Sequence, residues 1–222
     1  MKKTSTAVVV LCCVALFGSI TVIAASNMFA TNNRDYSDLL FRVGQIYREY
    51  LDSREDSLLR ENAFIESANF VIYESEIARI DEELRLMGRE DEREQAIRFI
   101  LRREVLYSEA LSRGFYASDR EIRDYINSNI ELMRSAVNFE NEMMAFFDGL
   151  GMTVEEYFES KLDIFKKEIT IHKFITAERE LIGTRSRLDD QEAVEDRLQS
   201  YLQSLVDNHV IANDLEELLS GR

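Results

Sequence analysis

The chain contains no proline, the residue that most strongly interrupts helices. Glycine is also scarce, with 8 glycines in 222 residues. Strand-rich folds need clusters of turn residues at short spacing, and such clusters are missing here. A proline-free, glycine-poor chain rich in Glu, Arg, Leu and Ile is suited to long, uninterrupted helices. The composition therefore predicts an all-α fold class.

Cysteine and histidine are almost absent. The two cysteines, Cys12 and Cys13, both lie near the N-terminus, so the rest of the chain has neither a disulfide framework nor a cysteine metal site. The two histidines, His172 and His209, each stand alone. Acidic residues are scattered beside arginines along the expected helix faces, as in i,i+4 pairs, and form no ligand cluster. Without a Ser-His-Asp order, a phosphate-binding glycine loop or an HExxH motif, we predict no catalytic residue, metal or cofactor.

Positive charge is in the minority. The chain has 27 Lys and Arg residues against 42 Asp and Glu residues, a formal net charge of −15. Such a charge repels the phosphates of nucleic acids and of anionic lipids. We therefore exclude nucleic acid as a partner. The charge is typical of a solvated helical exterior, and attraction of basic polypeptide segments is the alternative.

The N-terminus carries the one long apolar run of the chain. Lys2 and Lys3 precede an apolar stretch from 7 to 25, which ends in small residues. This run is longer than the ~7–15 residues of a typical signal core and close to the ~20 residues that span a bilayer. The positive end stays in the cytoplasm. We predict a single-pass helix in residues 1–25, with residues 6–25 in the cell membrane and 26–222 extracytoplasmic; a cleaved signal peptide and a secreted protein are the alternative.

Helical periodicity divides the rest of the chain. Residues 26–60 are expected to form a tether and an amphipathic helix over 36–51, because apolar side chains recur there at steps of three and four residues. Residues 63–72, with two short apolar runs, are the only plausible strand material and predict one small β-hairpin. Two capping boxes, Ser118 with Glu121 and Thr153 with Glu156, start helices. Helices are expected over 75–87, 90–113, 118–137, 139–150, 153–180 and 191–208.

Two segments carry a resemblance to a known family. The first is QAIRFILRREVLYSEALSRGF followed by ASDREIRDYI, over 95–126, and the second is FFDGLGMTVEEYFESKLDIFKKEITIHKFI, over 146–175. Together they resemble the N-terminal domain of SurA-type and PrsA-type extracytoplasmic chaperones. The residues that match the family's patterns are Ile100, Leu101, Val105, Leu106, Glu109, Ala110, Gly114, Gly151, Thr153, Glu155, Glu156 and Tyr157.

The resemblance implies an irregular helical bundle over 61–183, completed by a loop and helix in 184–222. Full-length foldases of the family insert a parvulin-type prolyl isomerase domain where this chain has only GTRSRLDDQ, so the resemblance implies binding without isomerisation. It implies an ATP-independent chaperone that binds unfolded or exported polypeptides. A membrane-anchored adaptor with one dedicated envelope partner is the alternative. The helix over 36–51 has no counterpart that we can name in the family.

A group of methionines and large apolar residues, here named the Met/Phe cluster, is the candidate peptide-binding surface. Methionine is flexible and polarisable, so a methionine-rich surface can repack around many apolar partners. The alternative is that these residues supply the core of the bundle. Neighbouring pairs in the cluster cannot all face one way on a helix, so part of it is expected to face a client, the C-terminal helix or a second copy of the chain. Its members are Met133, Phe139, Met143, Met144, Phe146, Phe147, Leu150 and Met152.

Overall fold

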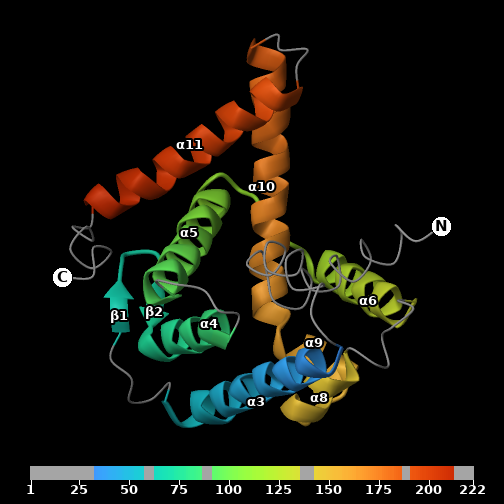
Figure 1. The fold of residues 1–222 in the computed structure, drawn as a ribbon. Coiled ribbons are helices and arrows are strands. Elements are labelled where there is room, and N and C mark those ends of the chain that lie inside the picture. The colour runs from blue at the N-terminus through green and yellow to red at the C-terminus, as the bar shows by residue number, and fades with distance from the viewer. Residues whose placement is uncertain (1–32, 58–62, 87–91, 136–142, 187–190, 213–222) are drawn as a thin grey trace. The chain divides into compact units, whose positions relative to one another are not determined.

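The computed structural model describes residues 33–57, 63–86, 92–135, 143–186 and 191–212 (Figure 1). Within these ranges the chain forms eight helices and one two-stranded sheet, which confirms the mostly helical fold with one small hairpin. The elements are α3 Asn33–Ser57, β1 Ala63–Glu66, β2 Val71–Tyr73, α4 Glu74–Leu86, α5 Glu92–Ser112, α6 Asp119–Ser135, α8 Met144–Leu150, α9 Val154–Ser160, α10 Leu162–Ser186 and α11 Gln191–Ala212.

The predicted N-terminal membrane helix lies outside the described residues. None of the helices in the described part of the chain is long and apolar enough to cross a membrane.

The described elements belong to two compact units, and the chain passes between them several times. The first, here named the α3 unit, contains α3, α4, most of α6, α8 and α9. The second, the α10 unit, contains β1, β2, most of α5, the first turn of α6, α10 and α11. The domain boundaries expected from the sequence stay a prediction.

The core of the α10 unit is formed by three helices. Buried side chains come from α5, α10 and α11, namely Leu106, Ala110, Phe174, Leu198 and Leu202. The helix from the C-terminal segment thus packs against α5 and α10 within this unit. In the hairpin, β1 and β2 pair antiparallel, and the ring of Phe70 in their turn lies 5.1 Å from the ring of His209 on α11.

The turn between α5 and α6 follows the local signals in the sequence. Gly114 takes a left-handed conformation, with φ of +81°, which glycine adopts without strain, and the Phe115 N–H donates to the Ala110 carbonyl. The Ser118 N–H donates to the carboxylate of Glu121, and the Glu121 N–H donates to the Ser118 hydroxyl. The predicted capping box is confirmed, and α5 ends at Ser112, one residue before the predicted end at 113.

A buried hydrogen bond joins this turn to α10. The Ala117 N–H donates to Thr170 Oγ1 at 2.9 Å, and both residues are buried. Replacing Thr170 with valine keeps the shape and leaves the N–H without this acceptor. We expect the free energy of unfolding, measured by urea denaturation, to fall by about 1–3 kcal/mol. Thr184→Val, at an exposed position of the same helix, is the control and is expected to change stability by less than about 0.5 kcal/mol.

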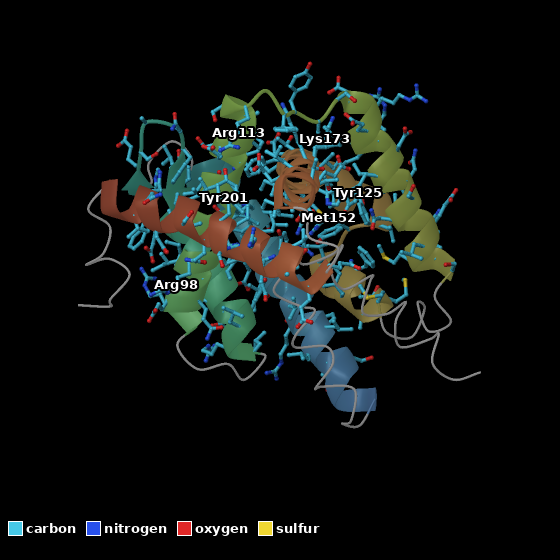
Figure 2. The ribbon with its side chains drawn as sticks, turned by 90° about the horizontal axis from the view of Figure 1, so that it is seen from above. Arg98, Arg113, Tyr125, Met152, Lys173 and Tyr201 are labelled. Atoms are coloured by element: carbon cyan, nitrogen blue, oxygen red, sulfur yellow. The ribbon has the colours of Figure 1, made fainter. Side chains whose placement is uncertain are left out.

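Lys173 of α10, labelled in Figure 2, binds the same turn through two contacts. Its ammonium donates to the Tyr116 carbonyl and to the carboxylate of Glu121. The bond from Lys173, followed by those from Ser118, lowers the pKa of Glu121 from 4.5 to about 2. Because the folded-state pKa lies below the ordinary value, the ionised carboxylate contributes its full stabilisation above pH 4.5. That contribution disappears as the pH falls towards 2.

We therefore expect Glu121→Gln to lower stability at neutral pH and to reduce the loss of stability between pH 4.5 and pH 2. Urea titrations of the variant and the wild type across that range measure both effects. Glu131→Gln, at an exposed position of the same helix, is the matched control. An acid-induced loss that is as large in Glu121→Gln as in the wild type would contradict the prediction.

Candidate binding site at the Met/Phe cluster

The structure brings the described members of the Met/Phe cluster into the α3 unit. Met133 lies on α6, Met143 precedes α8, and Met144 to Leu150 lie on α8. Met152, labelled in Figure 2, lies in the turn before α9. Phe139 lies outside the described residues. The buried members are Met133, Met143, Phe146, Phe147 and Leu150. Met152 is half-buried, whereas Met144 is 42% exposed, so the cluster has a packed body and an open edge.

Helix α3, which includes the unexplained segment 36–51, packs directly against α8. A Cβ atom built on Gly44 of α3 would lie 2.2 Å from the Phe146 carbonyl oxygen. A Cβ atom built on Gly149 of α8 would lie 2.1 Å from the Phe41 carbonyl oxygen. The two backbones therefore approach so closely that only glycine fits at either position.

Tyr157 of α9 lies at the centre of an aromatic layer formed with rings from α3 and α8. Its ring centroid lies 6.0 Å from that of Tyr47 on α3, 5.5 Å from Phe146 and 5.8 Å from Phe147. All three ring pairs are edge-to-face, the arrangement that the charge distribution of aromatic rings favours. Phe146 and Phe147 are both buried because α8 contacts α3 as well as Tyr157.

Two cations lie against the tyrosines of this layer. Lys161, at the C-terminal end of α9, places its Nζ 3.7 Å from the centre of the Tyr47 ring and 4.6 Å from that of Tyr157. The Arg79 guanidinium of α4 lies 4.7 Å from the centre of the Tyr47 ring and 5.1 Å from that of Tyr50. Both are cation–π contacts, which strengthen when water is excluded.

The charge of Arg79 is paired with the carboxylate of Glu83 on the same helix. Arg79 Nη1 donates to Glu83 Oε1 at 2.6 Å, and both side chains are 9% exposed. Burial is the largest single influence and opposes the charge, but Glu83, with smaller contributions from Tyr47, Tyr50 and Glu76, raises the pKa of Arg79 overall. Arg79 Nε is buried and has no hydrogen-bond partner among the described residues. Burial also raises the pKa of the Tyr47 hydroxyl, so this tyrosine stays neutral.

The chemistry of this site is that of a contact surface. It offers thioether, aromatic and aliphatic groups, and the described residues contain no group of three or more His, Cys, Asp or Glu side chains placed to hold a metal ion. Such a surface can bind an apolar polypeptide face without covalent chemistry.

Sequence reasoning found the apolar members of the site and missed its polar and glycine components. Gly44, Arg79 and Lys161 were not expected to take part in the site. Gly149 was expected only as a possible helix stop, and its contact with α3 was not anticipated. Gly44 could have been noticed, because an isolated glycine inside a helical apolar stripe often marks a close helix contact. No local pattern marks Arg79 or Lys161, whose roles depend on rings from other elements.

Comparisons of the chain with known protein families, with curated proteins and with solved structures found no match. The resemblance to SurA-type chaperones stays a prediction, carried by the sequence segments alone.

Proposed function

We propose that the protein is an extracytoplasmic, membrane-anchored module that binds unfolded or exported polypeptides through apolar contacts, as SurA-type chaperone domains do. Residues 6–25 form the anchor in this proposal, and no ATP, metal or covalent step is involved. The observation that carries it is the Met/Phe cluster, in which methionine, phenylalanine and leucine side chains gather around α8 and α9 and Met144 remains exposed. Flexible thioethers beside rigid aromatic rings suit a surface that accepts varied apolar segments.

The test is suppression of aggregation. The full-length chain, held in lipid nanodiscs, is added to a chemically unfolded protein that aggregates on dilution, and light scattering is followed without ATP. We expect suppression when the chain is in several-fold molar excess over the client, which empty nanodiscs do not give. An unchanged scattering curve at several-fold molar excess of the chain would refute the proposal.

The adaptor hypothesis makes a different prediction for the same protein. Photocrosslinking in cells from position 144, with a crosslinking amino acid in place of Met144, is expected to trap many unrelated exported chains if the protein is a chaperone. A single crosslinked partner would favour the adaptor. A prolyl isomerase assay on the purified chain completes the comparison, because activity there would contradict a role in binding alone.

A further inference from the structure

We infer that α3 occupies the client-binding surface of this protein, and that clients bind as amphipathic helices with a small residue at the crossing point. This inference rests on the proposed function and deepens it, because it names the form of the bound segment and the element that must leave before a client can bind.

Helix α3 presents its buried residues in the pattern of a bound helical peptide. Leu40, Val43, Gly44 and Tyr47 stand at positions i, i+3, i+4 and i+7, and all four are buried. An amphipathic helix lying in an apolar groove makes contact through this spacing. The surface that receives α3 is formed by α8 and α9, which carry most of the described Met/Phe cluster, together with α4.

The glycine crossing sets a size requirement on any helix that binds in the same way. At Gly44 the neighbouring atoms are the Phe146 carbonyl oxygen and the Leu150 nitrogen, 2.2 Å and 2.8 Å from a built Cβ. Both are backbone atoms, which cannot rotate aside as a flexible side chain can. A competing helix therefore needs a glycine, or must bind at a greater distance from α8.

The surface that receives α3 is partly charged, so α3 is not held by apolar packing alone. Arg79 and Lys161 both lie against the Tyr47 ring, and Arg79 Nε lacks a hydrogen-bond partner within the described part of the chain. Departure of α3 would remove Tyr47 from both cations and let water reach them. Buried charges that become hydrated recover their solvation energy, so opening costs less than exposing an apolar interface of the same area.

The experiment tests α3 and the surface that receives it separately. Gly44→Leu in the full-length chain, in lipid nanodiscs, places a side chain on α3 against the α8 backbone. It leaves the sequences of α8 and α9 unchanged. A fluorescently labelled synthetic peptide of residues 33–57 is the probe. We expect it to bind the Gly44→Leu chain at least about ten-fold more tightly than the wild type, where the surface is occupied. The same peptide carrying Gly44→Leu is the control and is expected to bind weakly to both chains.

Client binding is then measured on the same samples. We expect Gly44→Leu to suppress client aggregation at a several-fold lower concentration than the wild type, and the unmodified 33–57 peptide to abolish that gain. Val43→Ala, which weakens the packing of α3 without a clash, is expected to give an intermediate gain; helix content by circular dichroism shows that both variants stay folded. The inference is wrong if neither variant suppresses aggregation better than the wild type and the peptide does not inhibit suppression. If the peptide binds the Gly44→Leu chain but neither the wild type nor a variant suppresses client aggregation, the proposed function is refuted instead.

Discussion

Replacing Gly149 with alanine is expected to lower the free energy of unfolding by about 3 kcal/mol, a large effect for one methyl group. The new Cβ would lie 2.1 Å from the Phe41 carbonyl oxygen and 2.9 Å from the Phe41 carbonyl carbon. Because both atoms belong to the α3 backbone, the overlap is relieved only if α3 moves away from α8. That movement loosens the contacts of Val43 and Tyr47 together.

Urea denaturation measures the loss, and amide hydrogen exchange locates it. We expect faster exchange in α3 and α8, while α5, α10 and α11 keep their wild-type protection. Gly183→Ala is the matched control, because its Cβ would meet only Val194 Cγ2 at 3.9 Å. Alanine is the better helix former, so this control is expected to be neutral or to gain up to about 1 kcal/mol. Similar losses in the two variants would show that backbone contact at the α3–α8 crossing is not the cause.

The features that the sequence predicted well are those set by neighbours along the chain. The Thr153 capping box formed as expected, with the Thr153 hydroxyl accepting from the Glu156 N–H and the Glu156 carboxylate accepting from the Thr153 N–H. The glycine stop at Gly114 is local in the same way. These motifs satisfy backbone groups within one turn of helix, so a few adjacent residues are enough to specify them.

The break between α9 and α10 at Lys161 was not predicted by the local sequence pattern. The sequence predicted one helix over 153–180, but α9 ends at Ser160 and α10 begins at Leu162, which is also where the chain passes from one unit to the other. No proline or glycine marks the position. Lys161 is buried, and its ammonium contacts tyrosine rings of α3 and α9. Rings supplied from another helix are invisible to a helix pattern that reads only local sequence.

The Met/Phe cluster illustrates the same limit for the candidate site. Helical spacing separates Met143 from Met144 correctly, since one is buried and the other exposed. It does not anticipate that Phe146 and Phe147 are both buried, because that outcome depends on α3 as well as α9 contacting α8. Which apolar residues remain open to a client is therefore decided by the position of α3.

Glu83→Leu is expected to lower the free energy of unfolding by about 3–5 kcal/mol, because it leaves the buried Arg79 without its carboxylate partner. Urea denaturation measures the loss. Glu82→Leu, one residue earlier, is the matched control. Glu82 pairs with Arg85 at the surface, and exposed pairs contribute at most about 1 kcal/mol.

The double variant Arg79→Met with Glu83→Leu decides whether the loss comes from the unpaired charge or from packing. Removing both charges also removes their desolvation cost, and the methionine thioether can occupy the guanidinium's position beside Tyr47 and Tyr50. We expect the double variant to unfold within about 1 kcal/mol of the wild type, so that the two single losses are strongly non-additive. Arg79→Met is measured alone for the comparison. If the double variant instead loses the sum of the Arg79→Met and Glu83→Leu effects, the ion pair is not what makes Glu83 necessary, and the surface that receives α3 depends on side-chain shape alone.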